Sequence, residues 1–443
     1  MPLDNPFCSY TSGSDTTGTG TQLNPYKTVK KGLENLNQDG TLYVRGGTYP
    51  DMVSESGGSA TSNWNWDFPN GSGGGNYTTL KAYENEPVKF IPFLNTFAMM
   101  TWRDLQSYIK IEGIEMQANT NVGFQECFNA QSAYTGDHIW IQAVNCHGFT
   151  GQGILTGAYT DGLVLDSIFS AIGTTSLQHG IYLSNGAHRW QVGRTTFHTI
   201  AGFGINHYSG SGQADDCRYY NNLIYNYGTA GGHGLLIGNG DDNWAWNNIV
   251  RDGHANSSDG IIIDFGAAGH LAQGAKIFHN VVYRTMKNGM SIHEGGDVTA
   301  HLIRNNIIVD WNLGGTANRA AIKQIGGTFT KSNNIEDDGS VVPGDIWLDP
   351  GSRDFHLKAG ASTIIGQGLY DGDFPDDYDG VTRPNPSPDI GPFQYGTAIP
   401  PSILVPSPRT TQISVPFSFS AFDVSHGGDL ASVLVYIDKG TLS

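Results

Sequence analysis

Charged residues are scarce in this sequence, and long apolar segments are missing. Only 15% of its 443 residues are charged, and 41 acidic residues against 24 basic ones give a formal net charge of -17. Because such a chain repels phosphate groups, the balance argues against a nucleic acid partner. No segment approaches the roughly 18 consecutive apolar residues of a membrane-spanning helix, so we expect no membrane span.

Cysteine is rare too. The four cysteines are too few and too scattered for a disulfide framework, and Cys127 with Cys146 is the one pair that we consider for a bond between neighbouring repeats. The first residues, MPLDNPFCSYTSG, lack the charged and apolar regions of a secretory signal peptide. We therefore expect an extracellular protein whose signal peptide has been removed, or a virion-associated protein that leaves its cell by another route.

What the chain has in abundance is glycine, 60 residues of it, and a short repeated phrase. The phrase is a glycine followed by mostly apolar residues, and its copies begin roughly 24 to 32 residues apart. Helical repeats would need long segments with 3.6-residue periodicity, and none is visible. The spacing therefore predicts an all-β parallel solenoid whose coils lie about 4.8 Å apart. The copies begin at Gly153, Gly180, Gly204, Gly234, Gly260, Gly289 and, without the glycine, Ala321.

A second phrase, headed by asparagine, recurs inside each repeat. Alternating β-branched or aromatic residues follow the asparagine, which predicts a short strand, so each coil holds at least two strands. Asparagine suits the turn between them because it tolerates the left-handed conformation or stacks its amide in a ladder. The asparagines are Asn222, Asn248, Asn280, Asn306 and Asn334.

The ends of the chain differ from its repeats. Residues 1–22 predict an irregular lead-in, and Asn24-Pro25 predicts the start of an amphipathic helix that caps a β-helix domain over 23–397. Residues 398–443 begin with a Pro-rich linker and continue as alternating strands, which predicts part of an Ig-like β-sandwich. A Gly/Ser-rich insertion over 55–77 contains Trp64 and Trp66, and it is either a plain loop or a lid over a sugar site.

The run NPYKTVKKGLENLNQDGTLYVRGGTY, the coils after it and the closing segment PSPDIGPFQYG resemble the right-handed parallel β-helix superfamily of pectate lyases. This resemblance implies a right-handed parallel β-helix, and it implies several activities, since the superfamily contains lyases, hydrolases, epimerases, phage tailspikes and adhesins. The hydrolase branch is expected to place Gly-His-Gly after Asp-Asp. Here Gly232-His233-Gly234 precedes Asp241-Asp242, which argues against a polygalacturonase.

Strand alternation sorts the repeat positions into columns. The residue after each glycine is always apolar, which predicts that it faces the core: Ile181, Ile205, Leu235, Ile261, Met290 and Ile322. The next column then faces outward and holds Tyr182, Asn206, Leu236, Ile262, Ser291 and Lys323. A further outward column, two positions on, holds Ser184, Tyr208, Gly238, Asp264, His293 and Ile325.

Polar residues gather at one end of these outward columns. Asp264 and His293 occupy the same position in adjacent coils, and Glu294 follows directly. Lys323 lies one coil further and Tyr208 two coils before Asp264. In the superfamily that the chain resembles, the substrate groove runs along such a face, so we predict the catalytic site here.

These residue types suit the cleavage of a uronic acid polysaccharide. β-Elimination needs a base for the C5 proton, an acid for the leaving oxygen and a positive charge near the carboxylate. His293 or Lys323 is the candidate base, Tyr208 the candidate acid, and Asp264 either orients His293 or binds Ca²⁺. Hydrolysis would instead use two carboxylates, Asp264 with Glu294 or Asp241 with Asp242.

Further residues are candidates for binding. Trp244 offers a ring for stacking on sugars, and Asp241 with Asp242 is a candidate Ca²⁺ site. The histidines before the repeat glycines, His179 and His233, are either hydrogen-bonded turn residues or part of the groove edge. A basic patch of Lys276, Arg284, Lys287 and Lys323 would suit a polyanion. The predicted substrate-binding residues are Tyr182, Asn206, His233, Trp244 and Lys287.

The sequence thus favours an enzyme that acts on an acidic polysaccharide. Elimination is placed ahead of hydrolysis or C5-epimerisation, and no cofactor is indicated except Ca²⁺. The alternative is a non-catalytic glycan-binding or phage tail shaft, for which a homotrimer would be expected.

Overall fold

The computed structural model shows a parallel β-solenoid within the first of two compact units, Met1–Pro408, the second being Arg409–Ser443. Trp64, Trp66 and the predicted module over 398–443 lie outside the described residues. The structure describes residues 2–52, 68–84, 86–92, 98–102, 105–119, 125–130, 135–208, 212–264, 272–293, 300–337 and 339–396.

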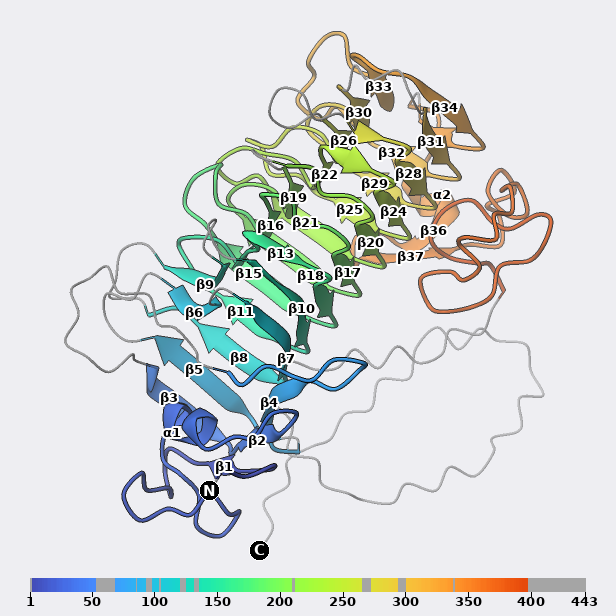
Figure 1. The fold of residues 1–443 in the computed structure, drawn as a ribbon. Coiled ribbons are helices and arrows are strands. Elements are labelled where there is room, and N and C mark those ends of the chain that lie inside the picture. Colours follow the sequence, from blue (N-terminus) through green and yellow to red (C-terminus); the bar gives the residue numbers. More distant parts are fainter. Residues whose placement is uncertain are drawn as a thin grey trace, which may run out of the picture. The chain divides into compact units, whose positions relative to one another are not determined.

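Three parallel sheets run along the solenoid, and each complete coil contributes one strand to each of them in turn (Figure 1). Sheet 1 contains β1 (Phe7–Cys8), β2 (Thr41–Val44), β4 (Thr78–Ala82), β7 (Gln106–Glu112), β10 (Thr135–Gln142), β14 (Leu163–Leu165), β17 (Gln191–Gly193), β20 (Arg218–Tyr220), β24 (Trp244–Trp246), β28 (Lys276–Phe278), β31 (His301–Arg304) and β34 (Phe329–Ser332), with β13 (Ala158–Thr160) beside β10. Sheet 2 contains β3 (Gly47–Met52), β5 (Val88–Pro92), β8 (Ile114–Gln117), β11 (Asn145–His147), β15 (Ile168–Ile172), β18 (Thr196–Ile200), β21 (Leu223–Tyr227), β25 (Ile249–Arg251), β29 (Val281–Tyr283), β32 (Ile307–Val309) and β35 (Ile335–Glu336).

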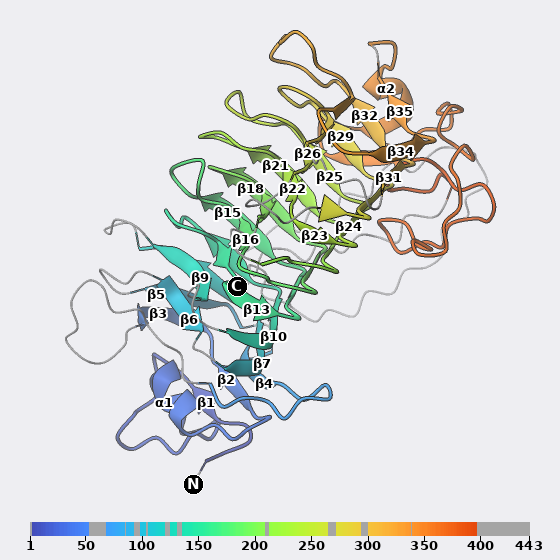
Figure 2. The same cartoon turned by 45° about the horizontal axis from the view of Figure 1, so that its top comes forward.

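Sheet 3 is built from the glycine-led phrases, and Figure 2 shows several of its strands, among them β16, β22 and β26, one after another. Its strands are β6 (Ala98–Trp102), β9 (Glu126–Ala130), β12 (Ile154–Leu155), β16 (Ile181–Leu183), β19 (Ile205–His207), β22 (Leu235–Ile237), β26 (Ile261–Ile263), β30 (Met290–Ile292) and β33 (Ile322–Gln324). The predicted apolar column is confirmed, because its members pair strand to strand and are all buried: Ile181, Ile205, Leu235, Ile261, Met290 and Ile322.

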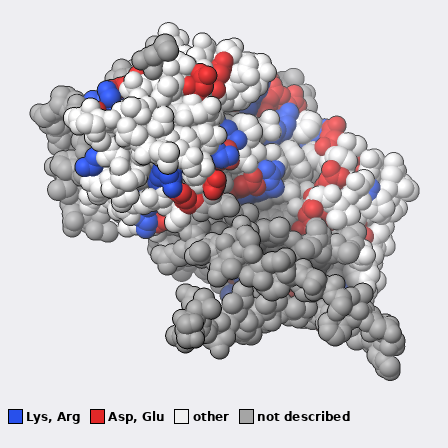
Figure 3. All heavy atoms as spheres, turned by 90° about the horizontal axis from the view of Figure 1, so that it is seen from below, with Lys and Arg blue, Asp and Glu red and all other residues white. Residues whose placement is uncertain are grey.

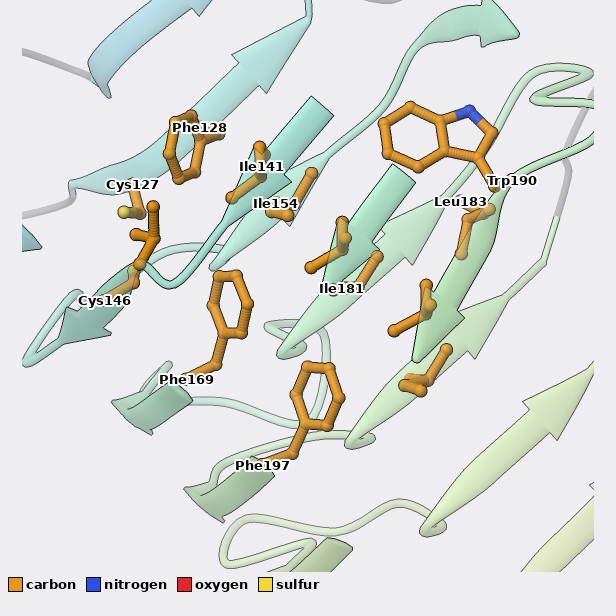
Figure 4. Packing of buried hydrophobic residues seen from close by; sticks show 14 of the residues in the cluster. Cys127, Phe128, Ile141, Cys146, Ile154, Phe169, Ile181, Leu183, Trp190 and Phe197 are labelled. Carbon is orange, nitrogen blue, oxygen red and sulfur yellow. The ribbon is translucent and has the colours of Figure 1, made fainter. Parts of the chain in front are cut away.

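The interior of the solenoid is apolar and closely packed. Figure 4 shows side chains from the three sheets meeting there, and the rings of Phe169 and Phe197 stack 5.4 Å apart between successive coils. Cys127 and Cys146 also lie in this interior, and all four cysteines are free and buried. The bond considered between Cys127 and Cys146 is therefore not formed.

The repeated glycine has a packing reason at the corner that leads into sheet 3. A Cβ atom on Gly234 would lie 2.3 Å from Val250 Cγ1, and one on Gly260 would lie 2.4 Å from Val282 Cγ1. Real Cβ atoms do not approach other atoms so closely, and both valines point into the core. Because glycine has no Cβ atom, its backbone can lie directly against the valine that sheet 2 contributes in the following coil.

The corner between sheets 1 and 2 holds an asparagine ladder. Each amide donates to the next, as Asn222 Nδ2 does to Asn248 Oδ1 (2.9 Å) and Asn248 Nδ2 to Asn280 Oδ1 (2.9 Å). The ladder continues through Asn306 to Asn334. The left-handed conformation belongs to the residue before each ladder asparagine, such as Asn247 with φ 54°. Both roles considered for asparagine are thus used, by neighbouring residues.

The N-terminal segment departs from its prediction in two ways. Within the supposedly irregular lead-in, β1 pairs with β2 in parallel. The helix α1 (Val29–Glu34) begins later than Asn24-Pro25 indicated, and Thr28 caps it by accepting from the Lys31 backbone N–H. Tyr26 explains the delay, because its backbone is hydrogen-bonded to Phe7 and Ser9 and is not available for a helix. The role of α1 as an end cap stays a prediction.

The segment after the last coil, part of the β-helix domain predicted over 23–397, packs on the outer side of sheet 2. It forms α2 (Pro343–Ile346) and the antiparallel pair β36 (Trp347–Asp349) and β37 (Asp354–Leu357). Trp347 and Phe355 lie in edge-to-face contact with each other and with Tyr283 of β29.

Two further strands, β23 (Gly240–Asp241) and β27 (Ala272–Gln273), pair in a sheet of their own. Among the described helices, none is long and apolar enough to span a membrane.

The ladder can be tested by replacing Asn248 with Ala. The change removes the two hydrogen bonds that Asn248 Oδ1 accepts from the backbone N–H and the side-chain amide of Asn222. It also removes the hydrogen bonds that Asn248 Nδ2 donates to Tyr219 O and Asn280 Oδ1. Because the site is fully buried, we expect the free energy of unfolding to fall by roughly 2 to 4 kcal/mol, measured by urea denaturation. The control Gln191→Ala, on an exposed strand position, should change it by less than about 0.5 kcal/mol. Equal effects of the two changes would contradict the ladder's role.

Candidate functional site

The first outward column predicted from the repeats does lie along sheet 3. Tyr182, Asn206, Leu236, Ile262, Ser291 and Lys323 pair in register from β16 to β33. The expectation of an open outward face is wrong for most of this column, because Leu236, Ile262 and Ser291 are 4%, 2% and 1% exposed. A continuous solvent-exposed wall is therefore not present, and accessible groups are found where the strands of sheet 3 end.

Asp264 and His293 are neighbours at that edge, as the repeat spacing predicted. Their backbones continue the pairing of sheet 3, since Asp264 N donates to Ile237 O and His293 N donates to Ile263 O. His293 Nδ1 lies 4.0 Å from Asp264 Oδ2, and their side chains are 29% and 27% exposed. An imidazole and a carboxylate thus share a site that solvent reaches.

Behind His293 lies a buried hydrogen-bond chain. Ser291 Oγ donates to Asp259 Oδ2 (2.6 Å), and His293 Nε2 lies 3.1 Å from Ser291 Oγ. Asp259 comes from the turn before β26 in the preceding coil, and Ser291 from β30. Neither was among the predicted site residues. The sequence signal for Ser291 was a polar residue after Leu236 and Ile262 in the same column. The sequence signal for Asp259 was its position directly before a repeat glycine, which His233 has one coil earlier.

His233 and Lys287 flank this chain on the turn side. The Asp259 backbone N–H donates to His233 Nδ1 at 3.2 Å, and His233 Nδ1 lies 3.9 Å from the Asp259 carboxylate. Burial lowers the pKa of His233 to about 4, helped by the positive charges of His293 and Lys287 and opposed by Asp259. His233 is therefore neutral at pH 7. Lys287 Nζ donates to Ser258 Oγ at 2.9 Å.

Other predicted residues are close to the site or further along sheet 3. Lys323 of β33 pairs with Ser291 and is half-buried, one coil beyond it. Tyr208 follows β19, three coils before His293, which corresponds to about 14 Å between backbones. That separation is too large for Tyr208 and His293 to act on the same glycosidic bond. Glu294 lies outside the described residues.

His179, Tyr182 and Asn206 form a separate polar group in earlier coils. His179 Nε2 lies 2.8 Å from Asn206 Nδ2, and the Phe203 backbone N–H donates to His179 Nδ1 at 3.0 Å. Burial alone lowers the pKa of His179 to about 3. Both ring nitrogens have neighbours and the ring is buried, so His179 fits the role of a hydrogen-bonded turn residue.

Trp244 does not belong to this site. It lies in β24 of sheet 1, with Arg218 and Lys276 of the two flanking strands each 4.1 Å from its ring centroid. A cation from each neighbouring strand thus lies over the ring, and the stacking role of Trp244 stays a prediction.

The acidic pair Asp241 and Asp242 also lies apart from sheet 3, in β23 and just after it. Burial raises the pKa of Asp241, and the neighbouring carboxylates of Asp215, Asp242 and Asp216 raise it further. Within the described ranges, no group of three or more His, Cys, Asp or Glu side chains is arranged to hold a metal ion. The candidate Ca²⁺ site thus lacks a ligand set there.

The predicted basic patch is not formed. Lys276 lies in sheet 1, Arg284 follows β29 of sheet 2, and only Lys287 and Lys323 accompany sheet 3. Figure 3 shows basic and acidic residues interspersed on the visible surface. Along sheet 3, positive charge for a negatively charged ligand would therefore come from Lys287 and Lys323.

A buried carboxyl group lies on sheet 3 at the far end from His293. Glu126, the first residue of β9, is 3% exposed, and its carboxyl accepts from Asn129 Nδ2 and from the Gln152 backbone N–H. Burial raises its pKa to about 7 and outweighs these two hydrogen bonds. In the described part of the chain, no cation pairs with Glu126.

Comparison with known proteins identifies the fold. No protein-family model matches the chain, and no curated protein matches it. Its structure is similar to that of pectate lyase Pel9A, with a TM-score of 0.60 and 13% identity over 89% of this chain and 97% of that chain. It is also similar to XylC in its complex with xylose, with a TM-score of 0.53 and 11% identity over 88% of this chain and 98% of that chain. The chain therefore has the parallel β-helix fold of pectate lyases, as the resemblance in its sequence implied.

The buried carboxyl group makes stability depend on pH. An unfolded glutamate has a pKa near 4.5 and the folded Glu126 one of about 7, so the folded state loses stability as pH rises through this window. We expect the wild type to lose about 3 kcal/mol relative to Glu126→Gln between pH 4 and pH 8, measured by urea denaturation at each pH. The control Glu34→Gln, in the exposed helix α1, should leave the pH dependence unchanged. Parallel stability curves for wild type and Glu126→Gln would contradict the assignment.

Proposed function

We propose that this protein is an enzyme that cleaves a uronic acid polysaccharide by β-elimination, with His293 as the base. The observation that carries the proposal is the meeting of His293 and Asp264, at 4.0 Å, where solvent reaches sheet 3. The fold is shared with pectate lyase Pel9A, which supports a saccharide substrate by analogy alone. As parts of the same proposal, the protein acts outside the cell or on a virion, and α1 closes the N-terminal end.

The chemistry assigns a role to each group. His293 takes the C5 proton, the C5–H electron pair forms the C4–C5 double bond, and the C4–O bond breaks. The leaving oxygen takes a proton from solvent. Lys323, one coil beyond Ser291, lowers the cost of charge developing at the uronate carboxylate, and Asp264 stabilises the imidazolium of His293. This assignment replaces Tyr208 as the acid, because Tyr208 lies three coils away.

The experiment is an activity assay on a panel of pectate, alginate and glycosaminoglycans, with added Ca²⁺ and with a chelator. Unsaturated products absorb near 235 nm, so a lyase raises this absorbance. We expect His293→Ala to lower kcat by about 100-fold or more, because it removes the base. The matched control is His138→Ala, since the side chain of His138 on sheet 1 is 34% exposed, against 29% for His293.

The outcomes separate the alternatives. New reducing ends without absorbance identify a hydrolase, and a changed C5 configuration without chain cleavage identifies an epimerase. Binding without any product identifies a glycan-binding shaft. A lyase whose rate survives His293→Ala would overturn the assignment of the base.

A further inference from the structure

Ser291 follows two apolar residues in its column of sheet 3. Its in-register neighbour on β26 is Ile262 and the next one, on β22, is Leu236, both buried. Ser291 is itself 1% exposed and Asp259 3% exposed. A buried hydroxyl and a buried carboxylate lower stability unless each is hydrogen-bonded, so the partners of both groups decide what they cost the fold.

The Asp259 carboxylate accepts hydrogen bonds from three donors. Its Oδ1 accepts from the Asn288 backbone N–H (2.9 Å) and from Asn288 Nδ2 (3.1 Å), and its Oδ2 accepts from Ser291 Oγ (2.6 Å). His233 does not donate to this carboxylate, because its Nδ1 accepts the Asp259 backbone N–H. The hydroxyl hydrogen of Ser291 is therefore committed to Asp259, and its oxygen lone pairs face His293.

The hydrogen bond from Ser291 to Asp259 decides which nitrogen of His293 carries the proton. Ser291 Oγ lies 3.1 Å from His293 Nε2 and has no hydrogen left to donate, so Nε2 must be the donor. In the neutral ring, Nδ1 then holds the lone pair. Nδ1 is also the nitrogen that lies near Asp264, 4.0 Å from Oδ2. The reactive nitrogen thus faces the accessible carboxylate, and the protonated nitrogen faces the protein interior.

We infer that Asp259 and Ser291 are positioning residues that hold His293 as the Nε2–H tautomer, with Nδ1 presented to the substrate. The catalytic consequence of this inference rests on the proposed function, whereas the tautomer does not. When Nδ1 gains a proton, the charge on the ring lies between Asp264 on one side and the Ser291–Asp259 chain on the other. Outer partners of a functional histidine act in this way on its tautomer and orientation.

The test reads the tautomer directly. In ¹⁵N-labelled protein at pH 8, two-bond ¹H–¹⁵N spectra report the two ring nitrogens of each histidine, and His293→Ala identifies the signals of His293. We expect wild-type His293 to show the Nε2–H pattern. In Ser291→Ala and Asp259→Asn, the two nitrogen signals should move toward each other as the tautomers mix. Ser291→Thr, which keeps the hydroxyl, should restore the wild-type pattern.

Kinetics supply a second readout on any substrate that the panel identifies. We expect Ser291→Ala to lower kcat about 10- to 100-fold with little change in KM. The matched control is Ser184→Ala, because Ser184 is also buried, 4% exposed, and its hydroxyl has no hydrogen-bond partner among the described residues. Thermal unfolding followed by circular dichroism confirms that each variant is folded.

The proposed function and the positioning role of Asp259 and Ser291 can be overturned separately. Absence of lyase activity in the wild type would overturn the proposed function and leave the spectra as the test of the tautomer. An Nδ1–H pattern in the wild type, or unchanged His293 signals in both Ser291→Ala and Asp259→Asn, would overturn the positioning role whatever the activity.

Discussion

In-register parallel pairing of the coils is the constraint on which the rest of this structure depends. Backbone hydrogen bonds hold successive coils at the strand spacing of about 4.8 Å, so residues one repeat apart become neighbours. Asp264 and His293 meet for this reason alone, since their backbone N–H groups donate to Ile237 and Ile263 in the coils before them. A shift of one residue in one strand would turn its side chains to the other face and separate the pair.

Two corners hold that register. The asparagine ladder satisfies buried backbone groups between sheets 1 and 2, as when Asn222 N donates to Asn248 Oδ1. Between sheets 2 and 3, the missing Cβ of Gly260 leaves room for Val282 of the following coil. Both devices depend on the same residue type recurring at the same place in each coil, which explains why they are visible as repeats in the sequence.

The candidate site lies where the apolar part of one column of sheet 3 ends. Along the column of sheet 3, Leu236 and Ile262 give way to Ser291, and the turn before β26 carries the buried Asp259. Such groups weaken a hydrophobic wall, and in this chain they join into one hydrogen-bond chain that ends at the accessible His293. Departures from a regular pattern that are compensated by specific partners are typical of functional sites.

The sequence by itself determined the solenoid, the inward column, the recurrence of the asparagine and the adjacency of Asp264 with His293. Each of these follows from the spacing of the repeats, which can be read directly from the linear sequence. Only the tertiary structure decided what surrounds each column. It placed Trp244 between Arg218 and Lys276 on another sheet, covered sheet 2 with the segment after the last coil, and joined Asp259 to Ser291. These contacts depend on side-chain direction and on packing between segments that share no repeat, and no spacing along the chain encodes them.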